Sequence, residues 1–190
     1  MLLREVNHRV KNNLTAIIGL LYNARRQVKD SNGETSQTVM NELVGRVRGL
    51  DTVHSLLSAS QWKPLRLSNL AAQVIRSSLQ LLPRDKHIAI SVYPSPIMVT
   101  PDQAHHLALL FNELATNSAK YALQDRDTAR IDVRISQDDD TARCVFRDDG
   151  PGYPQQVLLL ERHGAGLDLM RSIARDNLEE ICLCTTIRAL

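Results

Sequence analysis

The sequence predicts an α+β protein in which an N-terminal antiparallel helical hairpin precedes a domain of mixed helices and strands. Apolar residues recur at steps of three and four through the first third of the chain, a spacing typical of helices. Farther along, short segments alternate apolar and polar residues as strands do. The segment Trp62-Lys63-Pro64-Leu65 interrupts the helical pattern. We therefore expect two domains, at residues 1–62 and 63–190.

The composition is that of a folded protein and argues against several classes of function. Of 190 residues, 43% are hydrophobic and 23% charged, so the chain can bury a core. No run of 18 apolar residues occurs, and we expect no membrane span. Two Phe, four Tyr and one Trp offer little aromatic surface for stacking on bases, so we expect no nucleic-acid partner. The three cysteines have no paired spacing, which indicates reduced thiols in a cytoplasmic protein.

The first domain is expected to be two long helices joined by the turn Asp30-Ser31-Asn32-Gly33. Each helix has one apolar stripe, and a single hairpin cannot cover both stripes well. Two copies that form a four-helix bundle would cover them, so we expect a homodimer. The stripes comprise Leu3, Val6, Val10, Leu14, Ile17 and Leu21 in the first helix, and Met40, Leu43, Val47, Leu50 and Leu57 in the second.

The second domain should alternate helices with strands. Thr100-Pro101-Asp102 is a helix start, with proline at the first position and an acid in the first turn. The alternation of Ile131, Val133 and Ile135 predicts a strand. Helices are expected over residues 67–82, 101–122 and 166–174, and strands over residues 87–92, 131–135, 142–148 and 181–187.

His8 lies on the polar side of the first helix. At about 100° per residue it is roughly 160° from the middle of the apolar stripe, so it should face solvent. Arg4, Arg9 and Lys11 nearby would favour an approaching anion. A lone exposed histidine is most often an ordinary surface residue. A functional role for His8 therefore depends on the residues around it.

That surrounding sequence, LLREVNHRVKNNLTAIIGLL from Leu2 to Leu21, resembles the histidine-kinase subclass whose phosphorylation box reads HRxKNN. The resemblance implies that His8 accepts a phosphoryl group. Arg9 stands where the commoner subclass has an acidic base, so Glu5, one turn before His8, is the candidate acid/base partner. Asn12 stands where the commoner subclass positions a water for dephosphorylation, which leaves a phosphatase role open.

Three further segments and the order of elements resemble the ATPase fold shared by DNA gyrase, MutL proteins, heat-shock chaperones of that clan and histidine kinases. The segments are NELATN at 112–117 with Lys120-Tyr121, DDGPG at 148–152, and GAGL at 164–167. The resemblance covers about residues 64–180. It implies an α/β sandwich with a mixed sheet and one helical layer, which binds ATP.

The 101–122 helix brings Glu113, Asn117, Lys120 and Tyr121 near one face. The resemblance implies that Asn117 is a magnesium ligand, since Mg²⁺ prefers oxygen. It further implies that Glu113 orients or deprotonates the attacking group, that Lys120 meets phosphate, and that Tyr121 packs near the nucleotide.

In the DDGPG segment, the resemblance implies that Asp148 accepts a hydrogen bond from the adenine amino group. Gly150 and Gly152 would let the backbone approach the base. Gly164, Gly166 and Leu167 lie at the start of an expected helix, whose free backbone N–H groups would bind phosphate. The short lid before it carries Arg162, which is expected to touch the γ-phosphate.

The predicted function is a histidine autokinase of a two-component system, which uses ATP and Mg²⁺ and passes the phosphoryl group from His8 to a response regulator receiver domain. The upstream sensor domain or protein is expected outside this chain. Asn177-Leu178-Glu179-Glu180 replaces a usual glycine-rich turn, so we expect the last strand of the family to be missing. Two alternatives stay open: a phosphotransfer adaptor that binds no ATP, and a serine kinase or other ATPase of the same clan.

Overall fold

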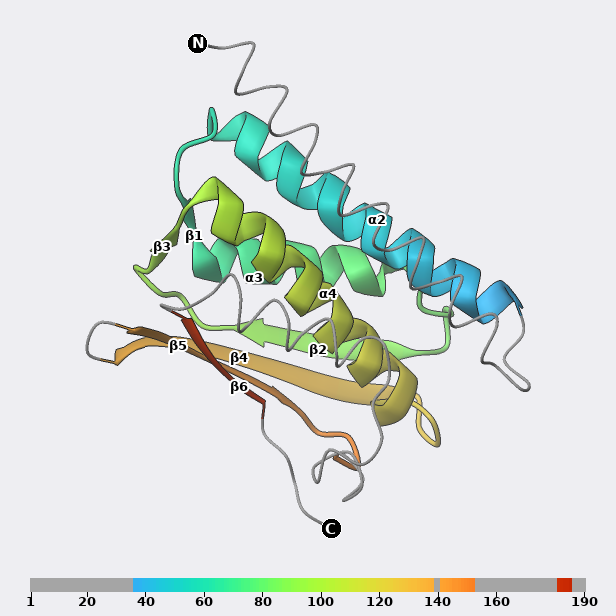
Figure 1. The fold of residues 1–190 in the computed structure, drawn as a ribbon. Coiled ribbons are helices and arrows are strands. Elements are labelled where there is room, and N and C mark those ends of the chain that lie inside the picture. Colours follow the sequence, from blue (N-terminus) through green and yellow to red (C-terminus); the bar gives the residue numbers. More distant parts are fainter. Residues whose placement is uncertain (1–35, 139–140, 153–180, 186–190) are drawn as a thin grey trace, which may run out of the picture.

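The structure is a computed structural model that describes residues 36–138, 141–152 and 181–185 (Figure 1). The helices are α2 (Ser36–Ala59), α3 (Leu67–Ser78), the short 3-10 helix η1 (Leu79–Leu81) and α4 (Pro101–Ala122). The strands are β1 (Leu65–Arg66), β2 (His87–Val92), β3 (Met98–Val99), β4 (Thr128–Asp138), β5 (Thr141–Asp148) and β6 (Ile181–Thr185).

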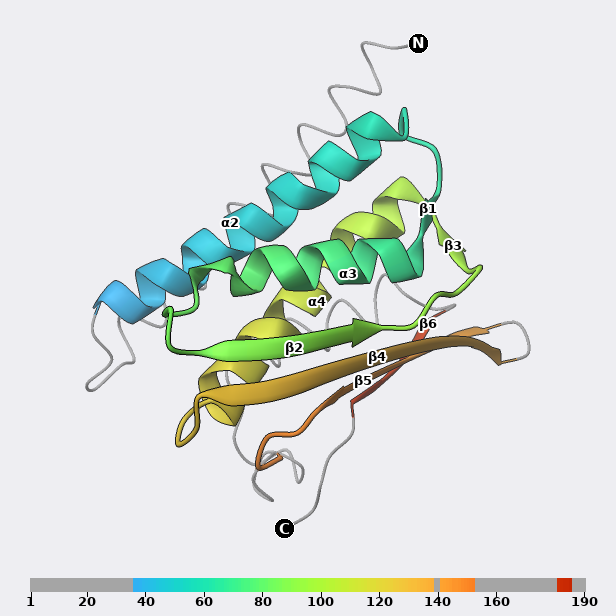
Figure 2. The same cartoon turned by 180° about the vertical axis from the view of Figure 1, so that it is seen from behind.

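The described elements form three layers. Helices α3 and α4 cover one face of the main sheet, and α2 lies across both helices on their far side (Figures 1 and 2). Helix α2 thus makes its main contacts with α3 and α4. An α+β architecture with a helical layer on a sheet agrees with the fold class expected from the sequence.

The main sheet is mixed and has the strand order β2-β4-β5-β6. Strand β2 pairs parallel with β4, β4 pairs antiparallel with β5, and β5 pairs parallel with β6. The register places Ile131 of β4 opposite Asp148, the last residue of β5. A second, two-stranded sheet pairs β1 with β3 through Leu65 and Val99.

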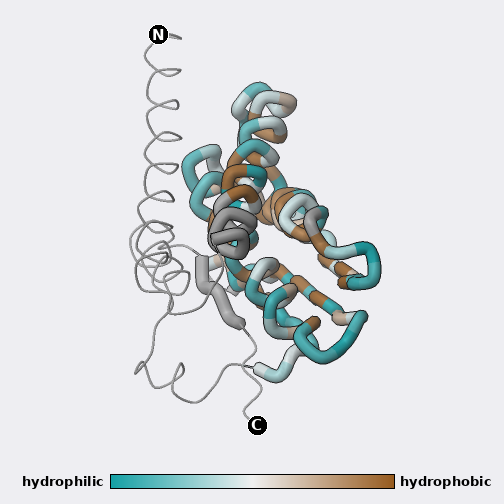
Figure 3. The backbone as a smooth tube through the Cα atoms, turned by 90° about the vertical axis from the view of Figure 1, so that its right-hand side faces the viewer, coloured by the Kyte–Doolittle hydropathy of each residue, from teal (hydrophilic) through white to brown (hydrophobic). Residues whose placement is uncertain are grey.

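The core fills the space between the helices and the sheet. Phe111 of α4 and Ile131 of β4 are fully buried, as are Leu67 and Leu70 of α3. Figure 3 shows the helical layer and the sheet edge-on, with hydrophobic positions in both. Leu50, Val53 and Leu57 of α2 belong to the same cluster of buried residues, so α2 shares one core with the layers beneath it.

The predicted elements within the described residues are confirmed, and two strands were missed. Helix α4 has the predicted bounds, because Thr100 Oγ1 accepts the Gln103 N–H at 3.3 Å while Gln103 Oε1 accepts the Thr100 N–H at 3.0 Å. Strands β1 and β3 have two residues each, too few to show an alternation. The first hairpin helix and the helix expected at 166–174 lie outside the described residues.

The predicted interruption after α2 is a tight left-handed turn. Gln61 and Trp62 have φ values of 54° and 60°, a region that side chains other than glycine seldom occupy. The Trp62 N–H donates to the Leu57 carbonyl at 2.6 Å, which closes the end of the helix. The Trp62 ring then packs between His54 of α2 and His105 of α4, with centroid distances of 5.5 and 6.4 Å.

The predicted apolar stripe of α2 is divided between two environments. Leu50 and Leu57 are buried in the core of the chain, whereas Val47 is 40% exposed. Val44 is also exposed, at 38%. Part of the stripe is therefore covered within the chain. Among the described helices, none is both long and apolar enough to cross a membrane.

Candidate nucleotide site

Helix α4 carries the polar residues expected to face the nucleotide, and their environments differ. Asn117 is half-buried, and no hydrogen bond of its side chain to another described residue is present. Lys120 and Tyr121 are exposed, with the Lys120 ammonium 5.8 Å from the Tyr121 ring centre. Glu113, two turns before Tyr121, is only 4% exposed. The face is shared as predicted, but its N-terminal end is covered.

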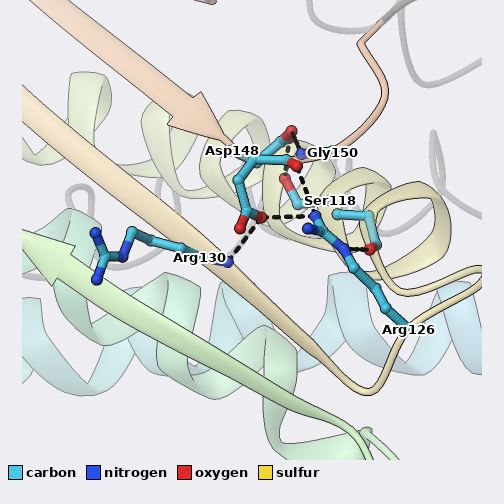
Figure 4. Close-up of polar contacts among 7 residues, drawn as sticks. Ser118, Arg126, Arg130, Asp148 and Gly150 are labelled. Carbon is cyan, nitrogen blue, oxygen red and sulfur yellow. Dashed lines mark hydrogen bonds and ion pairs between the residues drawn. The ribbon is translucent and has the colours of Figure 1, made fainter.

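Asp148 at the end of β5 turns its carboxylate toward α4 (Figure 4). The Ser118 hydroxyl donates to Asp148 Oδ2 at 2.6 Å, and the Gly150 N–H donates to Asp148 Oδ1 at 3.0 Å. A carboxylate oxygen has two lone pairs, so each oxygen keeps one for a further donor. Asp148 is exposed. The site therefore holds an oriented acceptor that an amino group from solvent can reach.

Glycine is favoured at the two glycine positions of the DDGPG segment for different structural reasons. A Cβ at Gly150 would lie 2.9 Å from Asp148 Oδ1 and 3.1 Å from the Ala122 Cβ, so the Asp148 carboxylate would have to shift. Gly152 has a φ of 83°, which favours glycine. Gly150 therefore lets the segment follow α4 closely, and Gly152 allows the backbone turn after it.

Arg126, in the loop between α4 and β4, holds the neighbouring Asp149. Arg126 Nη2 donates to the Asp149 carbonyl at 2.6 Å and to Asp149 Oδ1 at 2.7 Å, while its Nε donates to the Ala122 carbonyl. The Arg130 N–H donates to the same Oδ1 at 2.9 Å (Figure 4). The DDGPG segment is thus tied to the end of α4 and to the start of β4.

Glu113 forms a buried ion pair with Arg46 of α2. Arg46 Nη2 donates to Glu113 Oε2 at 2.9 Å, and Arg46 Nε donates to Glu113 Oε1. Arg46 is also only 4% exposed. Both carboxylate oxygens are engaged by one guanidinium in a fork geometry.

Two glycines of α2 face α4 beside this ion pair. A Cβ at Gly49 would lie 3.4 Å from the Asn112 Cβ, and one at Gly45 would lie 4.0 Å from Thr116 Cγ2. Asn112 is fully buried; the Ser78 hydroxyl donates to its Oδ1 at 2.7 Å, while its Nδ2 has no hydrogen-bond partner among the described residues. The backbone of α2 therefore approaches α4 on both sides of the Arg46–Glu113 pair.

Among the described residues, Asn117 fits the role of an oxygen ligand to a magnesium ion that is bound to nucleotide phosphates. Mg²⁺ at phosphates needs only one or two protein oxygens, because phosphates and waters complete its octahedron. The Asn117 amide is available for this role on α4. Within the described residues, no group of three or more His, Cys, Asp or Glu side chains could hold a metal by itself.

Several predicted site residues lie outside the described residues: His8, Glu5, Arg162, Gly164, Gly166 and Leu167. Sequence reasoning missed Ser118, Arg126 and Arg46. Ser118 directly follows Asn117, the last residue of the NELATN segment, so its position beside a predicted site residue was a usable signal. The signal for Arg46 was weaker. It is a basic residue between Gly45 and Gly49 and lies next to Val47 of the apolar stripe.

Two family models match the chain in succession. Residues 5–82 match the histidine kinase model, and residues 102–186 match the model of histidine kinase-, DNA gyrase B- and HSP90-like ATPases. Residues 83–101, which include β2 and β3, lie between the two matches. Their order is the order of acceptor and donor segments inferred above.

Curated relatives include the sensor histidine kinase PdtaS of Mycobacterium tuberculosis, 26% identical over 178 residues that cover 93% of this chain and 35% of that protein. Blue-light-activated histidine kinase 2 of Erythrobacter litoralis is 28% identical, over 91% of this chain and 50% of that protein. The chain thus spans between a third and half of these relatives.

Solved structures with the same fold include the histidine kinase domain of an Erythrobacter litoralis blue-light-activated kinase. It superposes with a TM-score of 0.57 at 17% identity, over 85% of this chain and 84% of that domain. A longer structure of that kinase gives a TM-score of 0.59 at 22% identity, over 91% of this chain and 51% of the other. The two family matches, the relatives and the fold agree, and the chain belongs to the two-component histidine kinases.

Proposed function

We propose that this chain is an ATP-dependent histidine autokinase that phosphorylates His8 and then passes the phosphoryl group to an aspartate of a response regulator. The observation that carries the donor half is Asp148, exposed at the end of β5 and oriented by Ser118 and the Gly150 N–H. An acceptor held in this way suits the amino group of adenine. Asn117 lies on the same helix as Ser118, one residue before it.

In the first step an imidazole nitrogen of His8 attacks the γ-phosphorus of ATP. The N–P bond forms as the bond from phosphorus to the β–γ bridging oxygen breaks, and that electron pair leaves with ADP. Mg²⁺ held by Asn117 supplies charge neutralisation at the phosphates when it is bound. In the second step a receiver carboxylate attacks the same phosphorus, and the histidine nitrogen recovers its electron pair.

The remaining residues have binding or acid/base roles in this proposal. Lys120 is an exposed cation on α4 for phosphate, and Tyr121, 49% exposed, offers a ring beside the nucleotide. Gly152, Arg162, Gly164, Gly166 and Leu167 would complete the binding of base and phosphates. Glu113 and Glu5 are the proposed acid/base groups for His8.

We further propose that two copies pair through their N-terminal helices and that a receiver domain docks near His8. Exposed Val44 and Val47 leave apolar surface on α2 for such a partner. We expect the reaction to take place in the cytoplasm, where ATP is the available donor, under control of a sensor domain or protein.

The test is incubation of the purified protein with γ-labelled ATP and magnesium, with His8→Gln and Asn117→Ala alongside. Acid-labile label on the wild type that is lost in both variants supports the proposal. Label that survives His8→Gln would instead indicate another acceptor and a different kinase of the clan. A folded protein that takes no label from ATP, yet accepts phosphoryl at His8 from a phosphorylated receiver, would be a phosphotransfer adaptor.

A further inference from the structure

We propose that Arg126 is a positioning residue for the adenine-binding carboxylate, so that nucleotide affinity depends on a side chain that does not touch the nucleotide. The inference rests on the proposed function, since it concerns how the Asp148 acceptor is held. Arg126 acts through Asp149, the direct neighbour of Asp148 in the chain.

The first support is the reach of the Arg126 guanidinium. Its Nη2 donates to both the carbonyl oxygen and the side chain of Asp149, and its Nε donates to the Ala122 carbonyl in the last turn of α4. A planar guanidinium can engage separate acceptors at once, whereas the single nitrogen of lysine cannot reproduce this fork. Arg126 therefore bridges α4 and the DDGPG segment.

The second support is that the Arg126 backbone is itself anchored. Lys86 Nζ donates to the Arg126 carbonyl at 3.0 Å, to Asp127 Oδ1 at 3.0 Å and to the Leu123 carbonyl at 3.3 Å. The His87 N–H donates to the Asp127 carbonyl at 2.8 Å where β2 begins. The loop that carries Arg126 is thus fastened to the sheet and can serve as a fixed support.

The third support is the dependence of Asp148 on the peptide that follows it. Asp148 Oδ1 accepts the Gly150 N–H, so the direction of the carboxylate follows the course of the backbone through Asp149. The Asp149 N–H also donates to the Arg130 carbonyl at 3.2 Å. Loss of Arg126 leaves the Asp149 carbonyl without this donor and lets the segment turn away from α4.

The exposure of the pair separates a positioning role from a structural one. The side chains of Arg126 and Asp149 are 39% and 46% exposed, and ion pairs at such exposure contribute little to folding stability. We therefore expect substitution of Arg126 to change nucleotide binding more than it changes the urea midpoint of unfolding.

The experiment measures magnesium-ADP binding by calorimetry for wild type, Arg126→Ala, Arg126→Lys and Arg126→Gln, with Arg84→Ala as the matched control. Arg84 is an exposed arginine outside the DDGPG contacts, with no hydrogen bond to the described residues. Arg126→Ala should weaken ADP binding about fivefold to tenfold, as loss of one or two net hydrogen bonds implies. Arg126→Lys should recover only part of the affinity, and Arg84→Ala should bind as wild type does.

Two further readouts distinguish positioning from general damage. In the labelling assay, the KM for ATP should rise by a similar factor while kcat at saturating ATP stays within about twofold. Combining Arg126→Ala with Asp149→Ala should weaken binding by less than the sum of the two single losses, because both changes remove the contact between Arg126 Nη2 and Asp149 Oδ1. Asp149→Asn, which keeps an Oδ1 acceptor, should bind nearly as wild type does.

Arg126→Ala that binds ADP as tightly as a binding-competent wild type would overturn this inference and leave the kinase proposal standing. Additive losses in the double variant would overturn it in the same way. A folded wild type without ADP binding would reject the kinase proposal and this inference together. If Arg126→Ala does not fold, the Lys and Gln variants carry the same comparison.

Discussion

Arg46 of α2 and Glu113 of α4, 67 residues apart in sequence, form a buried two-point ion pair across the helical layers. The pair joins the helix of the proposed acceptor domain to the helix of the proposed nucleotide site. In this arrangement both Glu113 oxygens are bound to the guanidinium. Activity that uses Glu113 on His8 therefore requires α2 to move away from α4.

Arg46→Ala should destabilise the protein strongly. Removing one partner leaves the other as an unpaired charge at 4% exposure, and such losses cost about 3–5 kcal/mol. Urea unfolding followed by circular dichroism measures the change. The double variant Arg46→Met/Glu113→Leu should recover most of the stability, because apolar residues of similar size tolerate burial. A single variant as stable as the wild type would show that the pair is not formed in solution.

A disulfide between α2 and α4 should stop autophosphorylation. The Cβ positions at Gly49 and Asn112 are 3.4 Å apart, near the roughly 3.5–4.5 Å that a disulfide requires. Oxidised Gly49→Cys/Asn112→Cys should bind magnesium-ADP yet take up no label from ATP, and a reductant should restore labelling.

The controls for the disulfide are the two single-cysteine variants treated with the same oxidant, which should keep their labelling rates. Peptide mapping identifies the bond and distinguishes it from oxidation of the native cysteines Cys144, Cys182 and Cys184. Equal labelling by the oxidised and reduced double variant would show that Glu113 acts, or is dispensable, with α2 in place.

Gly150→Ala should weaken nucleotide binding about tenfold, equivalent to ~1.4 kcal/mol, because the new methyl displaces the Asp148 carboxylate. The built Cβ lies 2.9 Å from Asp148 Oδ1. Gly45→Ala is the matched control, since its Cβ would make only 4.0 Å contacts and alanine favours a helix. Calorimetry with magnesium-ADP compares the two variants. Unchanged affinity in Gly150→Ala would remove Asp148 from the binding site.

Folding stability should fall as pH decreases below about 6.5. Burial lowers the pKa of His105 from its ordinary value of 6.5, and burial likewise lowers the pKa of His106. The unfolded chain therefore binds protons that the folded chain excludes, so stability is complete above pH 6.5 and decreases as the histidines of the unfolded state become protonated.

The histidine contribution can be separated by His105→Phe, which keeps a ring next to Trp62 and removes the titrating group. Urea unfolding between pH 5 and 8 should show a smaller pH dependence in the variant than in the wild type. His105 Nδ1 lies 2.7 Å from the Pro101 carbonyl, and His105 Nε2 is buried with no hydrogen-bond partner in the part of the chain that the structure describes. Identical pH profiles would show that His105 is not buried in solution.

Local sequence patterns were enough to predict the helices and strands whose ends are determined by residues within or next to the element. Thr100 and Pro101 define the start of α4, and the alternation from His87 to Val92 defines β2. The segment around Asp148 was identified by residue type and order, because a glycine-rich turn after a strand is a local feature. The family followed from these segments together.

Contacts between distant residues were decided by the tertiary structure alone. In the sequence, Gly45 and Gly49 only weaken a helix; in the fold both face Asn112 of α4. Arg46 and Arg126 look like ordinary surface cations until their acceptors are known. Burial and ion pairing depend on which helices pack together. The apolar periodicity of one helix does not indicate which other helix it packs against.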